Sequence, residues 1–172
     1  MQQKSVHWFP GHMQKAMRQI EEKLKLIDIV IEIVDSRAPS SSKNKFLEKL
    51  TKNKKRIIVM SKKDLADSTL LKKWEEKYKL EGYYPVPCDL NNNQDINSIL
   101  KAIQVVGKDK IDRDIRRGMK PQPIRVMVIG IPNVGKSTLI NRLSKRGSAS
   151  TANTPGHTRS QQWIRVDKTL EL

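Results

Sequence analysis

Apolar residues along the chain follow two patterns, short continuous runs and a helical spacing of three or four positions. The continuous runs are rich in β-branched residues and predict buried strands at 28–35, 56–60, 83–88 and 124–130. Prolines within the third run weaken that prediction, because proline cannot donate to a strand ladder. The helical spacing predicts helices over 10–26, 46–52, 68–81 and 95–117, with Gly107 as a candidate break in the last of them, and a further helix after 138.

Strands that alternate with helices in this way predict an α/β fold. The expected architecture is a mostly parallel sheet with helices on both faces. Such sheets bind ligands outside the carboxyl ends of their strands. The loops that follow the predicted strands are therefore the places to search for chemistry.

The loop after the fourth strand reads GIPNVGKST over residues 130–138. It matches the phosphate-loop pattern G-x-x-x-x-G-K-[ST], in which glycines let backbone N–H groups close around phosphate oxygens. Lys136 adds a charge for the β- and γ-phosphates, and Ser137 offers a hydroxyl to Mg²⁺. A strand before the loop and a helix after it are the required setting. The candidate nucleotide contacts here are Asn133, Val134, Gly135, Lys136, Ser137 and Thr138.

The loop after the second strand reads SKKDL and resembles the N-K-x-D guanine-recognition motif of GTPases. A carboxylate at Asp64 can accept two parallel hydrogen bonds from guanine, whereas adenine would leave it unsatisfied. Lys62 can lay its aliphatic stem along the base. Ser61 replaces the usual asparagine and is shorter, so we expect it to supply only part of that residue's contacts and guanine preference to rest on Asp64.

The base-reading loop precedes the phosphate loop along this chain, which reverses the usual order in GTPases. A circular permutation explains the reversal, because the strands can keep their places in the sheet while the chain ends move. The third GTPase motif, S-A-K, has no match after the third strand, where residues 88–90 read Cys-Asp-Leu. A backbone contact to the guanine oxygen tolerates such side-chain changes.

The net charge of +16, from 34 Lys and Arg against 18 Asp and Glu, favours a polyanionic partner such as nucleic acid. A solvated basic surface is the alternative. The single cysteine, Cys88, excludes an internal disulfide, fits a reducing cytosol, and is expected in the core rather than as a nucleophile. No apolar run approaches the roughly 20 residues of a membrane helix, so no membrane association is expected.

Six segments together resemble the ribosome biogenesis GTPase A family of circularly permuted GTPases. They are HWFPGHM (7–13), EKLKLIDIVIEIVDSRAP (22–39), SKKDL (61–65), GIPNVGKSTLINRL (130–143), TPGHT (154–158) and QQWIRV (161–166). The resemblance spans nearly the whole chain. It implies a cytoplasmic enzyme that binds GTP and GDP with Mg²⁺, hydrolyses GTP, and contacts the large (50S) ribosomal subunit and its rRNA during late assembly. We expect a monomer.

The resemblance also assigns three residues. Thr158 matches the switch threonine that ligates Mg²⁺ beside Ser137 and senses the γ-phosphate. Asn133 matches a phosphate-loop asparagine that helps to hold K⁺ in potassium-stimulated GTPases. His12 matches a histidine implicated in hydrolysis, which could orient the attacking water. A structural helix-start histidine, a turn asparagine and an exposed-turn threonine are the respective alternatives.

The family pattern continues past Leu172 with a D-x-P-G loop and then a helical RNA-binding domain. We therefore expect residues 1–172 to form a G domain that is truncated at its C-terminus and lacks the helical domain. Two rival functions remain open at this point. One is an RNA-binding scaffold with a nucleotide site but no effective hydrolysis, and the other is an ATPase with a phosphate loop.

Overall fold

The computed structural model describes residues 11–43, 45–131, 133–146 and 170–172. The helices are α1 (Gly11–Leu24), α2 (Lys45–Leu50), α3 (Ser68–Leu80), α4 (Asn93–Arg116) and α5 (Lys136–Arg146), with a single 3₁₀ turn, η1 (Lys63–Leu65). The strands are β1 (Ile29–Asp35), β2 (Lys55–Ser61), β3 (Tyr84–Pro87), β4 (Ile124–Ile129) and β5 (Leu170–Glu171). The four predicted strands are confirmed, and β5 was not predicted.

The strands form one parallel sheet in the order β3-β2-β1-β4-β5. The central strand, β1, pairs with β2 and β4, and Ile29 lies opposite both Lys55 and Val126. Because every pair is parallel, the carboxyl ends of the strands meet at one edge of the sheet. The loops after β1, β2 and β4 are thereby brought together, although they are far apart in the sequence.

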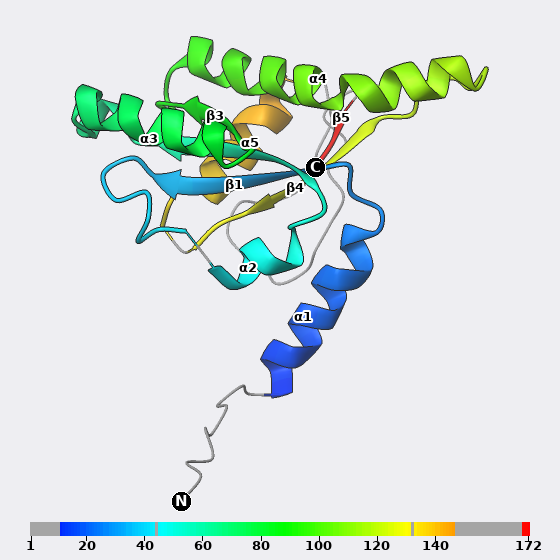
Figure 1. Ribbon diagram of the computed structural model, residues 1–172, viewed down its shortest axis with the longest axis horizontal. Helices are drawn as coiled ribbons and strands as arrows, with labels where there is room; N and C mark the ends of the chain where they lie inside the picture. Colours follow the sequence, from blue (N-terminus) through cyan, green and yellow to red (C-terminus); the bar gives the residue numbers. More distant parts are fainter. Residues whose placement is uncertain (1–10, 44, 132, 147–169) are drawn as a thin grey trace, which may run out of the picture.

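Helices cover both faces of the sheet, as predicted from the alternation of elements (Figure 1). On one face, α4 and α5 bury Ile99, Ile103, Leu139 and Leu143 against the apolar side chains of the central strands. The other face packs against α1, α2 and α3 in two smaller clusters. The core is thus a sheet enclosed between two helical layers, and β1 and β2 are buried on both faces.

The prolines of β3 are accommodated because β3 is the edge strand of the described sheet. Its neighbour is β2, with Pro85 opposite Ile58 and Pro87 opposite Met60. The amide of Cys88 donates to the carbonyl of Met60 at 2.8 Å. Residues of a strand alternate in the direction of their N–H groups, so the nitrogens of the prolines face away from β2 and no ladder bond is lost.

The candidate break at Gly107 was wrong. Helix α4 runs for 24 residues without interruption, and Gly107 is buried within it. A Cβ atom there would lie 2.6 Å from Cδ1 of Ile124. The glycine therefore serves close packing of α4 on β4 rather than a change of direction. The helix also begins earlier than predicted, because the side chain of Asn92 caps it by accepting from the amide of Gln94 at 2.8 Å.

Cys88 is fully buried, and this burial raises the pKa of its thiol to about 12. A thiol that stays protonated is a poor nucleophile. The expected place of this residue in the core is confirmed. Among the helices of the described ranges, none has the length and apolar character that crossing a membrane requires.

Candidate nucleotide-binding site

The base-reading loop and the phosphate loop touch at the carboxyl edge of the sheet. Ser61, the last residue of β2, is fully buried, and its hydroxyl lies 2.7 Å from the carbonyl oxygen of Val134. The same hydroxyl lies 3.1 Å from the carbonyl of Val34, at the end of β1. One short side chain thus connects β1, the base-reading loop and the phosphate loop.

A second connection between the two loops is made by Lys62. Its backbone adopts a left-handed conformation with φ of 58°, which turns the chain sharply out of β2. Its Nζ donates to the carbonyl of Asn133 and to Oδ2 of Asp35, both at 3.1 Å. Lys62 therefore links β1 to the phosphate loop. Its aliphatic chain is held at one end by the backbone and at the other by the hydrogen bonds of Nζ.

Asp64 lies in the η1 turn with its carboxylate exposed and without a hydrogen-bond partner among the described residues. Its neighbour Lys63 is engaged elsewhere: its Nζ donates to Oδ1 of Asp95 at 2.8 Å, and its amide donates to the carbonyl of Cys88. The turn is thus anchored on one side while Asp64 keeps both carboxylate oxygens available as acceptors, which is the requirement for reading guanine.

Residues 88–92, which follow β3, lie beside both loops. The carboxylate of Asp95 accepts from the amide of Asp89 at 2.8 Å as well as from Lys63. Arg142 of α5 donates to the carbonyl of Asn91 at 3.1 Å. Asp95 therefore holds residues 88–92, which stand where other GTPases have S-A-K, at this edge of the sheet. The backbone of these residues can contact a guanine base there. Sequence reasoning missed Asp95, whose signal was an acidic residue in the first turn of a helix beside the expected motif.

The phosphate loop has the backbone shape that its sequence predicts. Gly135 has φ of +108°, and a Cβ atom on it would lie 2.6 Å from Cδ1 of Leu90. Helix α5 begins immediately afterwards at Lys136, with Ser137 and Thr138 exposed in its first turn. Free N–H groups at a helix start, a lysine and an exposed serine hydroxyl fit a nucleotide phosphate with Mg²⁺. Asn133, with φ of 67°, exposes its side chain on the same loop.

Asp35 is a site residue that sequence reasoning missed, although it ends a strand at the predicted edge. Its carboxylate accepts from the backbone amide, Nε and a terminal nitrogen of Arg37 at 2.9, 3.0 and 2.7 Å, and from Lys62. The hydrogen-bonded Arg37 guanidinium, followed by Lys62, holds the pKa of this carboxyl well below its ordinary value of 3.8. Asp35 is therefore charged throughout the neutral range and fixes Lys62 at the junction of the two loops.

We expect Asp35→Asn to weaken GDP binding several-fold and to lower the free energy of unfolding by about 1–2 kcal/mol, because charged hydrogen bonds are lost. A carboxyl with a lowered folded-state pKa stabilises the fold above its ordinary pKa and loses that effect as pH falls through the folded value. The variant should therefore match the parent chain in strong acid. Fluorescent GDP titration and urea unfolding across pH measure both effects.

Arg37→Ala is the matched control, since it removes the exposed partner of Asp35 and leaves Lys62 in place. It should reduce stability slightly and leave GDP affinity close to that of the parent. Equal losses of GDP affinity in the two variants would show that Asp35 acts through Arg37 and not through Lys62.

Two predicted site residues have side chains outside the described part of the structure. His12 is the second residue of α1, but its side chain is not among those described, and Thr158 lies in the undescribed range 147–169. Their roles stay predictions.

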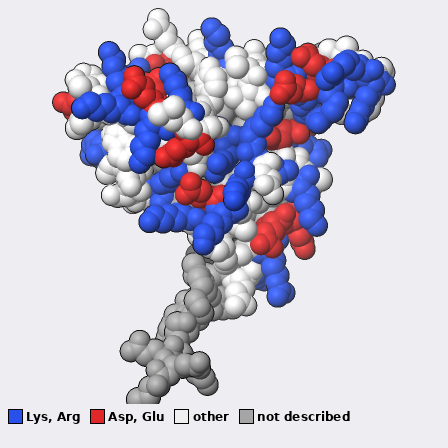
Figure 2. Space-filling view, viewed as in Figure 1, with Lys and Arg blue, Asp and Glu red and all other residues white. Residues whose placement is uncertain are grey.

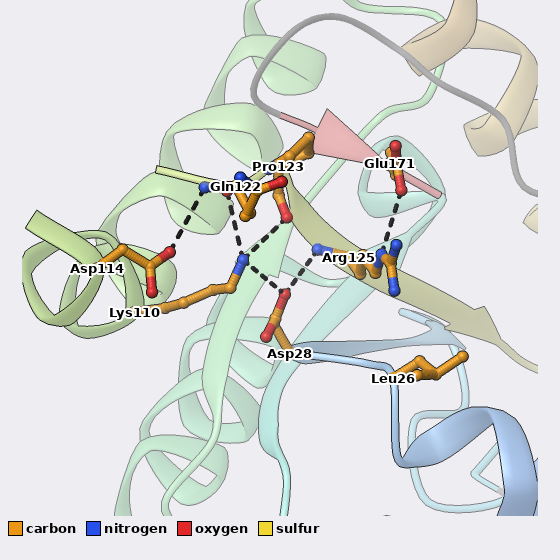
Figure 3. Close-up of a pocket in the computed structure, with 8 residues that line it drawn as sticks. All are labelled: Leu26, Asp28, Lys110, Asp114, Gln122, Pro123, Arg125 and Glu171. Carbon is orange, nitrogen blue, oxygen red and sulfur yellow. Dashed lines mark hydrogen bonds and ion pairs between the residues drawn. The ribbon is translucent and has the colours of Figure 1, made fainter. Parts of the chain in front are cut away.

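A separate cavity of about 470 Å³ lies at the amino ends of the strands, opposite the nucleotide edge (Figure 3). Its charged side chains are directed toward one another. Lys110 of α4 donates to the carbonyl of Pro123 at 3.0 Å and lies 3.4 Å from Asp28, which also accepts from the amide of Arg125 at 2.9 Å. These contacts join α4, the 117–123 connection and the starts of β1 and β4, so the cavity's polar groups serve the fold.

Known proteins resemble this chain in sequence. Residues 125–172 match a family described as "50S ribosome-binding GTPase". Proteins named ribosome biogenesis GTPase A from Bacillus licheniformis and Bacillus cereus are 49% and 46% identical to this chain, each over 167 residues. Those matches take in 97% of this chain and 59% and 56% of the relatives, so the chain spans somewhat more than half of their length.

Solved structures agree with the sequence comparisons. The crystal structure of GNP-bound YlqF from T. maritima superposes with a TM-score of 0.59 at 27% identity, over 91% of this chain and 55% of that one. The GDP-bound YlqF structure gives a TM-score of 0.58 over 90% of this chain and 55% of that one.

The parallel sheet, in which the loop after β2 precedes the phosphate loop along the chain and contacts it, has the fold of a circularly permuted GTPase domain. Within that class, the chain is similar over 97% of its length to proteins named ribosome biogenesis GTPase A.

Proposed function

We propose that this protein binds and hydrolyses GTP as a switch in the late assembly of the large ribosomal subunit. The observation that carries the proposal is the hydrogen bond of Ser61 to Val134, because it joins the loop proposed to read guanine to the phosphate loop at one edge of the sheet. The names of the relatives support the ribosomal setting. The bound species would be GTP and GDP with Mg²⁺.

The described residues divide the work of nucleotide binding. Asp64 reads the guanine edge, and Lys62, held by Asp35 and Asn133, flanks the base. The backbone of the phosphate loop and Lys136 take the phosphates, and the start of α5 adds its positive end. Ser137 would hold Mg²⁺ together with Thr158, and the ion would neutralise charge on the phosphates.

Hydrolysis would depend on residues that the resemblance assigns. His12 would orient the attacking water, and Thr158 would report the presence of the γ-phosphate. Asn133 would help to hold K⁺, a cation that can stabilise charge developing between the phosphates. Its exposed side chain on the phosphate loop supports this role. Replacing K⁺ by Na⁺ is therefore expected to slow turnover.

The proposed partners are the large ribosomal subunit and its rRNA, met by a monomer in the cytoplasm. The net charge of +16 supports an RNA partner, because basic side chains gain affinity for phosphates by releasing counterions. The single buried cysteine is in keeping with a reducing compartment.

His12→Ala tests the enzymatic part of the proposal. We expect it to lower GTP hydrolysis stimulated by large ribosomal subunits by about 10²–10⁴-fold, the usual contribution of a general acid–base group, while leaving GDP affinity unchanged. Phosphate release with and without subunits, together with fluorescent GDP titration, measures these two quantities.

His7→Ala is the control, since it removes the neighbouring histidine and should leave stimulated hydrolysis intact. If the parent protein binds GTP yet shows no stimulation by subunits, the non-hydrolysing RNA scaffold is the better description. If His12→Ala and His7→Ala turn over equally, His12 is not the catalytic residue.

A further inference from the structure

The last part of α4 extends beyond the body of the fold. Its buried residues lie mainly in the first half, up to Gly107. After Gly107, Ile111 is partly buried and packs against the core, and only Asp114 is buried. The helix nevertheless continues to Arg116, and this end projects past the strands on the right of Figure 1. The final turns therefore contribute little to the core, and their exposed side chains need another explanation.

Basic residues dominate this projecting end. We define the α4 basic end as the exposed residues Lys108, Arg113, Arg116, Arg117 and Lys120. Within the described ranges none of the five side chains forms an ion pair. In Figure 2, blue side chains gather at the right-hand end of the molecule, where α4 ends in the same view of Figure 1.

The acidic residues of the same segment do not neutralise this charge. Asp109 pairs with Lys55 of β2 at 2.7 Å, and Asp114 is buried toward the amide of Gln122. Asp112 lies four positions from both Lys108 and Arg116, but forms no ion pair with either among the described residues. The negative end of the helix dipole favours cations in the last turn, but this effect does not extend back to Lys108. Cations that have no ion-pair partner in the described part of the chain, gathered at the projecting end of a helix, are suited to a polyanion.

We propose that the α4 basic end binds the phosphate backbone of RNA, and the proposal rests on the ribosomal function proposed above. Arg113, Arg116 and Arg117 lie three and four positions apart, so they share one side of the helix end. Guanidinium groups can each hold a phosphate through two N–H groups. Because α4 begins at the edge of the sheet proposed to bind nucleotide and ends at the opposite edge, RNA bound here leaves the nucleotide edge uncovered.

Exposed Ile115 and Met119 lie among these cations, at 58% and 48% exposure, and would suit a protein partner instead. Cations outnumber the exposed apolar side chains in this segment, which favours RNA. The experiment must therefore separate the two kinds of contact.

The test compares two triple variants in the full chain, using a fluorescein-labelled RNA hairpin and purified large ribosomal subunits. Arg113→Ala/Arg116→Ala/Arg117→Ala removes three charges from the α4 basic end. Lys52→Ala/Lys72→Ala/Lys73→Ala removes three exposed charges from the opposite helical layer and is the matched control. Alanine keeps the helix favourable in both.

We expect the arginine variant to bind hairpin and subunits at least about tenfold more weakly, with a salt dependence shallower by about 0.7–0.9 per lost phosphate contact. The control should retain most of its affinity. Unchanged fluorescent GDP affinity and circular dichroism verify that each variant is folded. Arg113→Lys/Arg116→Lys/Arg117→Lys restores the charge and should recover most of the salt dependence.

Equal weakening in the two triple variants would overturn the proposal, since total charge and not this surface would then decide binding. It would equally be overturned if Ile115→Ser/Met119→Ser abolished subunit binding while the arginine variant did not, because the partner would then be a protein. A parent protein that binds GTP but neither RNA nor subunits contradicts the proposed ribosomal function itself, a result distinct from either of these.

Discussion

Asp64→Asn is expected to lower affinity for GDP by at least about a hundredfold and to create binding of xanthosine diphosphate, because two charge-assisted hydrogen bonds are each worth about 1.5–3 kcal/mol. The carboxylate accepts from two N–H groups of guanine, whereas an amide presents one acceptor and one donor. Xanthine carries an oxygen where guanine carries its amino group, so it matches the amide. Asp64 is exposed and has no hydrogen-bond partner among the described residues, so the exchange is possible without rebuilding the turn.

Competition of GDP, xanthosine diphosphate and ADP against a fluorescent nucleotide measures the effect. Asp67→Asn is the matched control, since it removes the same charge three residues away and an asparagine can keep the helix cap that Asp67 provides for α3. Unaltered GDP preference in Asp64→Asn would refute base reading by this residue. Displacement of the fluorescent nucleotide by ADP as readily as by GDP in the parent protein would favour the ATPase instead.

Gly135→Ala should destabilise the protein by about 2–4 kcal/mol and remove measurable nucleotide binding. The backbone at φ of +108° disfavours any Cβ by about 1 kcal/mol, and contact with Leu90 adds an overpacking cost of about 1–3 kcal/mol. Relief of that contact requires the buried end of the Leu90 side chain to move, or the phosphate loop or the segment after β3 to shift. A shift of the loop or of that segment would disturb the geometry that closes around the phosphates.

Thermal unfolding with and without GDP measures both consequences. Gly82→Ala is the control, because Gly82 also has a positive φ, +88°, yet a Cβ atom there would meet nothing within 4 Å. It should show the backbone cost alone and should retain the stabilisation by GDP. Equal losses of stability at the two positions would show that Leu90 yields freely and that the phosphate loop is not tightly confined.

The sequence predicted the sheet and the phosphate loop well, because each is encoded locally. Continuous apolar runs predicted β1, β2 and β4, and the pattern around Lys136 predicted a loop between a strand and a helix. Prolines made β3 uncertain, since a proline's cost depends on whether its strand lies inside the sheet or at its edge. The predicted helix break at Gly107 was wrong for a related reason. The role of this glycine is set by Ile124, which is its neighbour only in the folded chain.

The parts of the site that escaped prediction are contacts between distant loops. Asp35 looked like the end of a strand, and only the parallel register brings it to Lys62. Ser61 was expected to make part of the contacts of an asparagine. The structure places its hydroxyl against two carbonyls because the residue is fully buried where β1 and the phosphate loop meet. Such roles depend on which strands become neighbours, which no local pattern encodes.

The position of β1 at the centre of the sheet has a consequence for synthesis of the protein. Its pairing with β2 joins nearby segments, whereas its pairing with β4 joins residues about a hundred positions apart, a long-range contact that forms slowly. A growing chain therefore holds β1, β2 and β3 before β4 has emerged. During that interval one side of β1, among the most apolar strands here, lacks its partner. We expect this transient open edge to be the part of the nascent chain most prone to aggregation and most in need of chaperones.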